Sequence, residues 1–207
     1  MTKDFKIKQW KETCKALLTM FAFCFIGVSQ AQLLLEAPLS KNLNLTSYSS
    51  YANTGDKINT IHELLISKDT LEFKSLSHLG SDVGFTVDNY WIRFSIINRT
   101  NNAQVYFLQT ARPVTDVVNL YLIDKTGQII SKNNGDVMPY SEKEIASRNN
   151  LFKINLPKDS ELTAYVLLKS DGEALEATLN LMPENELLIA TYKNQLFNGV
   201  FYGVLLL

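Results

Sequence analysis

The stretch YWIRFSII, residues 90–97, decides the fold class of this chain. One face of it carries Tyr90, Ile92, Phe94 and Ile96, and the other carries Trp91, Arg93 and Ser95. This alternation has the side-chain period of a β-strand, whereas a helix would repeat its apolar residues every 3.6 positions. The stretch is therefore predicted to be a half-buried strand.

Further segments repeat this pattern along the chain. They are rich in β-branched and aromatic residues, and short polar segments with turn-forming residues separate them. The segments are AQVYFLQT (103–110), VVNLYLID (117–124), LFKINL (151–156), TAYVLLKS (163–170) and LEATLNLM (175–182). Short strands joined by such turns predict an all-β fold, an antiparallel β-sandwich, and argue against alternating βαβ units.

One short helix is predicted in the early part of the chain. The segment NTIHELLIS (59–67) has apolar residues at helical spacing, and either Asn59 or Thr60 can supply its N-cap. Residues 32–45 are predicted to be an extended lead-in to the sandwich.

The N-terminal 31 residues have the organisation of a secretory signal peptide. Five lysines precede the 13-residue stretch ALLTMFAFCFIGV (16–28), which is followed by SQA (29–31). This apolar stretch is shorter than the roughly 20 residues that a membrane-spanning helix needs. We predict export and cleavage before Gln32, with an uncleaved anchor as the alternative.

Composition after residue 31 excludes several classes of function. Both cysteines, Cys14 and Cys24, belong to the leader, so disulfides and zinc–cysteine sites are excluded from the rest of the chain. The leader also takes five of the 20 basic and two of the 21 acidic residues, which leaves 15 basic and 19 acidic residues. A net negative charge argues against nucleic acid as a partner.

Catalytic motifs are absent from the sequence. It has no nucleophile elbow, P-loop or dinucleotide-binding glycine pattern, and its two histidines, His62 and His78, are not in an H-E-x-x-H arrangement. We therefore expect no enzymatic activity, no metal and no cofactor. A glycosidase with two carboxylates from distant strands is the remaining catalytic alternative, because sequence spacing does not exclude it.

Five blocks in order carry a resemblance to a known family. They are LGSDVGFTVDNYWIRFSIINRT, ARPVTDVVNLYLIDKTGQ, NNGDVMPYSEKEIASRNNLFKINLP, AYVLLKSDGEALEATLNLM and NGVFYGVLLL. Together, over residues 46–207, they resemble the second type of extracellular domain of bacterial seven-transmembrane receptors with diverse intracellular signalling modules (7TMR-DISM). The resemblance implies a jelly-roll-like sandwich over residues 46–183, similar to carbohydrate-binding modules, in the periplasmic part of an inner-membrane protein.

The C-terminal segment, residues 184–207, is interpreted through the same resemblance. It looks like a connector followed by the start of the first transmembrane helix. Its apolar part, residues 196–207, would give only about 18 Å of helix, which is shorter than a hydrocarbon core of roughly 30 Å. We expect a truncated helix here. The alternative is a tail that packs back onto the sandwich.

Two groups of residues are candidates for ligand binding. Trp91 and Arg93 share a strand face and could offer an aromatic surface with a neighbouring cation, although Trp91 could equally fill the core. The second group follows from the resemblance, because the family has a Gly-Asp, a Pro, an Arg and an Arg-Asn before the next strand. The matching residues are Gly135, Asp136, Pro139, Arg148 and Asn149, and Lys143 stands where the first arginine is usual.

These residues also have structural alternatives. Lys143 keeps the positive charge of an arginine but lacks its planar, bidentate fork. The Asp136 side chain could cap a turn, and Arg148 with Asn149 could order a loop.

The resemblance implies a function in ligand sensing. We expect a domain that binds a small molecule, with carbohydrates as candidates, and passes the signal to a seven-helix bundle in the membrane. A homodimer is one assembly that the sequence does not exclude. The alternative is a secreted carbohydrate-binding or adhesion module without a membrane bundle.

Overall fold

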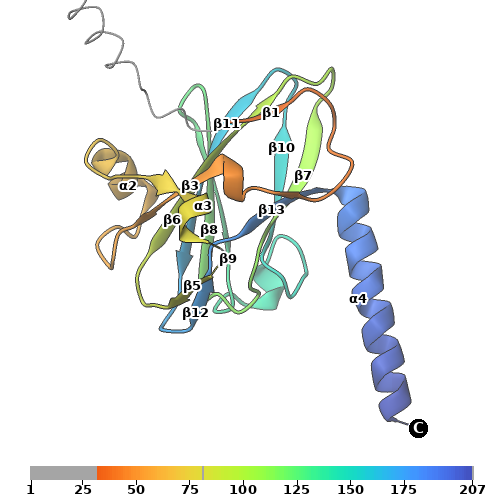
Figure 1. The fold of residues 1–207 in the computed structure, drawn as a ribbon. Coiled ribbons are helices and arrows are strands. Elements are labelled where there is room, and N and C mark those ends of the chain that lie inside the picture. The colour runs from red at the N-terminus through yellow and green to blue at the C-terminus, as the bar shows by residue number, and fades with distance from the viewer. Residues whose placement is uncertain (1–31, 81, 207) are drawn as a thin grey trace, which may run out of the picture. The chain divides into compact units, whose positions relative to one another are not determined.

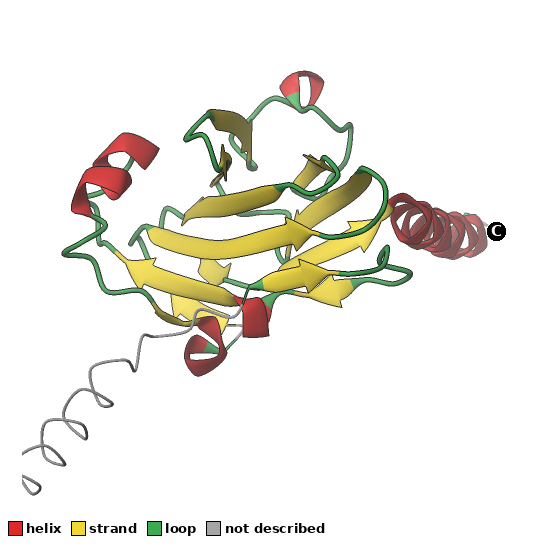
Figure 2. Ribbon diagram, turned by 90° about the horizontal axis from the view of Figure 1, so that it is seen from above, coloured by secondary structure: helices red, strands yellow, loops and turns green. Residues whose placement is uncertain are grey.

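The computed structural model describes residues 32–80 and 82–206, so the predicted signal peptide lies outside the described residues. Two sheets form a sandwich of mostly antiparallel strands (Figures 1 and 2). In spatial order the larger sheet contains β4 (Lys74–Ser75), β3 (Ser49–Asn53), β6 (Tyr90–Asn98), β11 (Glu161–Lys169), β8 (Val117–Asp124) and β9 (Ile129–Asn134). The smaller sheet contains β10 (Leu151–Leu156), β7 (Gln104–Thr110), β13 (Leu179–Pro183) and β2 (Leu43–Asn44). This architecture confirms the predicted antiparallel sandwich, while the jelly-roll-like connectivity stays a prediction.

Shorter elements complete the fold. β1 (Leu33–Leu35) pairs in parallel with the end of β6, and β5 (Asp82–Phe85) pairs with β12 (Ala174–Glu176) as a separate two-stranded sheet. The helices are η1 (Thr46–Tyr48), α2 (Ile61–Ser67), α3 (Leu76–Leu79), η2 (Tyr140–Glu142) and α4 (Glu184–Leu205). The residues predicted as an extended lead-in therefore contribute strands to both sheets.

The main core lies between the two sheets. The larger sheet contributes alternate residues of β6, β8 and β11, and the smaller sheet contributes alternate residues of β7, β10 and β13. On β6 the inward residues are Tyr90, Ile92, Phe94 and Ile96, as the period-two pattern predicts. This packing is the usual arrangement of two aligned sheets.

The outer face of the larger sheet, which points away from the smaller sheet, is covered by α2. Trp91 is fully buried there with Ile61, Leu64, Tyr165 and Leu167. The prediction of a half-buried strand is therefore wrong at this end of β6, because a helix covers the second face.

α2 begins with a capping box at Thr60. Glu63 N donates to Thr60 Oγ1 at 3.3 Å, and Glu63 Oε2 accepts from Thr60 N at 3.0 Å and from Asn59 N at 2.8 Å. Of the two predicted N-cap residues, Thr60 is therefore the cap.

The segment predicted as one strand, 175–182, is divided between two sheets. β12 pairs with β5, and β13 pairs with β7 and β2, with Ala177 and Thr178 between them. Ala177 is fully buried, and the Thr178 carbonyl accepts a hydrogen bond from Ala111 N at 3.1 Å. These contacts fix the position of the two residues between β12 and β13.

The predicted connector and the start of the predicted transmembrane helix together form the single helix α4. It follows directly after β13, and none of its side chains is buried (Figure 1). Among the described residues, no helix combines the length and the apolar character needed to cross a membrane.

Candidate functional site

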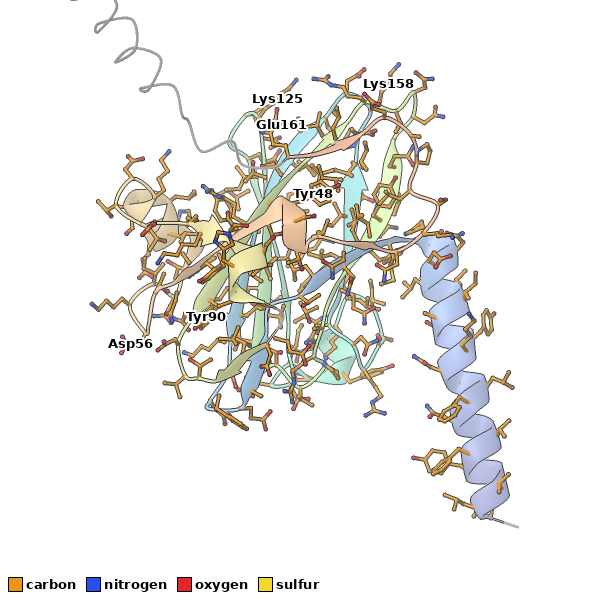
Figure 3. The ribbon with its side chains drawn as sticks, viewed as in Figure 1. Tyr48, Asp56, Tyr90, Lys125, Lys158 and Glu161 are labelled. Carbon is orange, nitrogen blue, oxygen red and sulfur yellow. The ribbon has the colours of Figure 1, made fainter. Side chains whose placement is uncertain are left out.

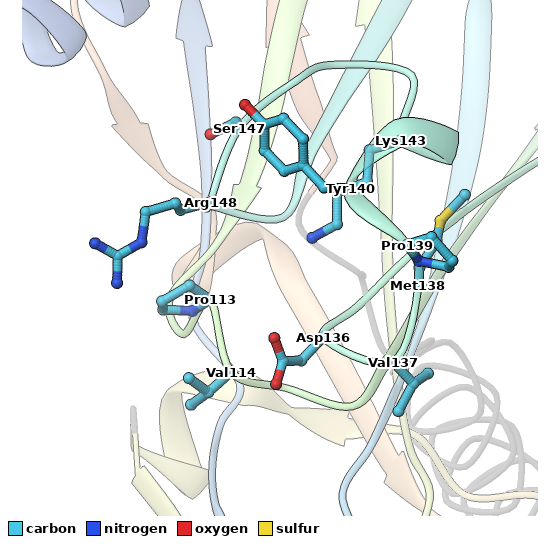
Figure 4. A pocket seen from close by; sticks show the side chains of 10 residues that line it. All are labelled: Pro113, Val114, Asp136, Val137, Met138, Pro139, Tyr140, Lys143, Ser147 and Arg148. Carbon is cyan, nitrogen blue, oxygen red and sulfur yellow. The ribbon is translucent and has the colours of Figure 1, made fainter.

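Two loops at one end of the sandwich line an open, polar cavity, which we call the loop pocket. One loop, residues 111–116, joins β7 to β8, and the other, residues 135–150, joins β9 to β10. The cavity has a volume of about 420 Å³. Its lining residues are Pro113, Val114, Asp136, Val137, Met138, Pro139, Tyr140, Lys143, Ser147 and Arg148 (Figure 4). Three of the six candidate binding residues, Asp136, Lys143 and Arg148, therefore meet in one place.

Gly135 sets the distance between the two loops. Its φ is +130°, and an added Cβ would lie 2.1 Å from the Asp116 carbonyl oxygen. A side chain is excluded by both the backbone conformation and the close contact. Directly after it, Asp136 N donates to Thr115 O at 2.9 Å and Val137 N donates to Asp116 O at 3.3 Å. The backbone, rather than a side-chain cap, therefore holds Asp136 at the pocket.

Two buried asparagines support the loops from behind. Asn150 Nδ2 donates to Arg112 O at 3.1 Å and to Pro113 O at 3.4 Å. Asn134 Nδ2 donates to Leu151 O at 3.2 Å, and its Oδ1 accepts from Gly135 N at 2.9 Å. These contacts satisfy backbone groups that would otherwise be buried without partners. The sequence interpretation named Asn149 for loop ordering and missed Asn150, which is the fully buried residue.

A salt bridge joins the longer loop to the sheet. Lys132 Nζ of β9 lies 2.6 Å and 2.8 Å from the two carboxylate oxygens of Glu144. Lys132 therefore neutralises the Glu144 carboxylate. Lys143 and Arg148 of the same loop line the pocket instead.

Trp91 and Arg93 lie apart from the loop pocket, on the outer face of the larger sheet. Trp91 Nε1 donates to Ile58 O at 3.1 Å, and its ring stacks on Tyr121 at a centroid distance of 5.8 Å. The Arg93 guanidinium lies 4.2 Å from the centroid of the Phe73 ring. These contacts favour the core interpretation of Trp91.

Burial at this outer face also affects the ionisation of Tyr121. The pKa of Tyr121 is raised because burial disfavours the charged phenolate.

Asn149 lies beside the pocket without lining it. It is half-buried, and its backbone N donates to Ser147 Oγ at 3.1 Å. A ligand contact for Asn149, Trp91 or Arg93 stays a prediction.

A second hollow, of about 460 Å³, opens between the edge strands β9 and β10. Leu122, Ile130 and Leu162 give it a more apolar lining. We favour the loop pocket as the candidate site because charged and polar side chains of the 135–150 loop converge in it, as polar groups do in small-molecule sites. Within residues 32–80 and 82–206, no group of three or more His, Cys, Asp or Glu side chains is arranged to hold a metal ion.

Comparison with known families identifies a match. The sequence model of the family described as 7TMR-DISM extracellular 2 matches residues 46–183, about two-thirds of the chain. The matched range includes the sandwich strands from β3 to β13 and both loops of the pocket. No curated protein matches the chain.

Proposed function

Because the chain belongs to the 7TMR-DISM extracellular 2 family, whose members are non-catalytic extracellular sensor domains of signalling receptors, we propose that its sandwich binds a small-molecule ligand outside the membrane. The ligand binds in the loop pocket, and a carbohydrate is the ligand class that the pocket suits best. The observation that carries this proposal is the convergence of Asp136, Lys143 and Arg148 on one cavity from a single long loop.

The lining supplies the groups that a sugar requires. The Tyr140 side chain is 59% exposed and offers an aromatic surface for the apolar side of a sugar ring. Asp136 accepts hydrogen bonds from hydroxyl groups, and Lys143 and Arg148 donate them. A volume of about 420 Å³ falls in the usual range for small-molecule sites.

The signal leaves the pocket through the smaller sheet. β7 runs directly into the 111–116 loop and pairs with β13 from Thr110 to Tyr106, and β13 is followed at once by α4. A ligand that binds one arrangement of the loops more tightly than another raises the population of the first arrangement. The size of this shift is limited by the difference between the ligand's affinities for the two arrangements. In this proposal α4 passes the shift to the membrane bundle of the receptor. Membrane attachment through the C-terminal segment and a homodimer stay predictions.

A thermal-shift screen of the purified protein against saccharides and other small molecules tests this proposal. Ligands of the loop pocket raise the melting temperature of the wild type and lose that effect in Asp136→Ala and Arg148→Ala. Both residues are exposed, so neither substitution should itself unfold the protein. Ligands that stabilise the wild type and both variants equally would contradict the assignment of the site.

A further inference from the structure

The charges in the loop pocket are separated. Figure 4 shows the Asp136 carboxylate and the Lys143 ammonium pointing into the cavity from opposite sides, with the Arg148 guanidinium at its edge. Within the described residues, no ion pair joins Asp136 to Lys143 or to Arg148. Both signs of charge are therefore available to a ligand at different positions.

The lining of the pocket carries more positive than negative charge. Lys143 and Arg148 both line the cavity, and Asp136 is the only acidic side chain among its lining residues. Glu144, which lies next to Lys143 in the chain, is held by Lys132 of β9 at 2.6 Å. Of the two acidic neighbours of Lys143 in the chain, Glu142 and Glu144, this salt bridge engages Glu144, and neither lines the cavity. The two lining cations are therefore suited to an anion.

An apolar surface lies on the same loop as these charges. Pro139 and Tyr140 line the pocket between Asp136 and Lys143 in the sequence, and the Tyr140 ring appears beside Lys143 in Figure 4. A ligand that satisfies the whole lining needs a ring with an apolar side, hydroxyl donors for Asp136 and an anionic group for the two cations. Neutral sugars lack the anionic group.

We infer that the ligand of the loop pocket is an acidic saccharide that contains a uronic acid. Its carboxylate binds Lys143 and Arg148, its hydroxyls donate to Asp136, and its ring lies on Tyr140. Charge-assisted hydrogen bonds to a carboxylate are about twice as strong as neutral ones. An acidic saccharide should therefore bind more tightly than a neutral one. This inference rests on the proposed function and adds the charge of the ligand to it.

Isothermal titration calorimetry of the purified protein tests the inference with matched pairs of ligands. The probes are galacturonate, glucuronate, mannuronate and guluronate oligosaccharides, each beside its carboxyl-reduced neutral counterpart. We expect at least one acidic oligosaccharide to bind about tenfold or more tightly than its neutral counterpart. Added salt should weaken the acidic ligand and leave the neutral one unchanged.

Single substitutions then assign the preference to the pocket. Lys143→Met and Arg148→Met should each remove most of the preference for the acid, because the acid loses a charge-assisted hydrogen bond where the neutral counterpart loses only a weaker neutral one. Lys158→Met is the matched control, because Lys158 lies in the turn between β10 and β11, at the far end of β10 from the pocket (Figure 3). This control should keep the full preference.

The outcomes separate this inference from the proposed function. Equal affinities within every pair, all abolished by Asp136→Ala, would overturn the inference and leave a neutral-sugar sensor standing. Stabilisation by α-amino acids instead of any saccharide in the thermal-shift screen would overturn the inference and the choice of carbohydrate, while the pocket would remain a ligand site. A preference for the acid that persists in both methionine variants would also overturn it.

Discussion

The outer patch around Trp91 and the loop pocket each bring an aromatic ring and a cationic side chain together, but they differ in what satisfies those groups. In the outer patch, Trp91 donates to a backbone carbonyl and Arg93 stacks on Phe73 under a helix-covered face. In the loop pocket, Tyr140 and Lys143 line an open cavity. The comparison indicates that the same residue types are structural where the protein itself supplies their partners, and available for binding where it does not.

Removing the Trp91 ring should have the largest effect on stability. Trp91→Ala leaves a cavity under α2 and removes one of the two donors to the Ile58 carbonyl, so we expect the free energy of unfolding to fall by about 3–5 kcal/mol. Urea denaturation followed by circular dichroism measures this loss. Ligand affinity at the loop pocket should not change. A variant that keeps its stability but loses ligand binding would show that Trp91 belongs to the site.

Substituting Gly135, beside the loop pocket, should lower the stability of the protein almost as strongly. Gly135→Ala forces a Cβ against the Asp116 carbonyl and strains a backbone at φ +130°, for an expected loss of about 3 kcal/mol. Gly127→Ala is the matched control, because Gly127 also has a positive φ but has open space around it, and should cost about 1 kcal/mol. Equal losses in the two variants, measured by urea denaturation, would mean that the close contact with Asp116 does not constrain the loops.

The capping box of α2 should have a smaller, pH-dependent effect. Thr60→Ala removes the N-cap oxygen and should lower stability by about 1 kcal/mol at neutral pH. The backbone N–H groups of Asn59 and Thr60 lower the pKa of Glu63. Because the folded state lowers this pKa, the contribution of Glu63 is present above its unfolded pKa and is lost as the pH falls through its folded pKa.

The melting temperatures of wild type and Glu63→Gln from neutral to acidic pH measure this contribution. The wild type should be the more stable protein at pH 7, and the difference should shrink on acidification. A difference that stays constant with pH would contradict a role for the Glu63 charge.

The Lys132–Glu144 salt bridge should have the smallest effect on stability. The pair is partly exposed, so Glu144→Gln should change the free energy of unfolding by about 0.5 kcal/mol or less. We expect faster amide hydrogen exchange within residues 135–150, because the loop loses its contact with β9. Glu142→Gln, in the same loop, is the control and should leave the exchange unchanged. Identical exchange in both variants would show that the salt bridge does not order the loop.

The long strands and α2 could be predicted because their patterns are local. β6, β8 and β10 carry a period-two pattern, β7 and β11 are runs of β-branched and aromatic residues, and the observed bounds of all five lie close to the predicted ones. The short strands β1 and β2, in the predicted lead-in, could not be found in this way. Strands of two or three residues exist only because longer neighbours pair with them, and the sequence pattern does not contain this information.

Within the candidate site, the sequence could predict residue types but not their surroundings. The resemblance led to Asp136, Lys143 and Arg148, which the fold brings together. Periodicity put Trp91 and Arg93 on one face but could not indicate that α2 covers that face. Asn150 was missed because a buried asparagine that binds backbone carbonyls looks like its half-buried neighbour Asn149 in the sequence.

Amide chemical-shift mapping of the ¹⁵N-labelled protein, titrated with saccharides from the acidic and neutral panel, tests the central claim most directly. Our account predicts shift changes concentrated in the two pocket loops, residues 111–116 and 135–150, with a weaker response along β13 toward α4. Shift changes concentrated instead around Trp91 and α2, with the loops unaffected, would contradict the assignment of the loop pocket as the sensor site.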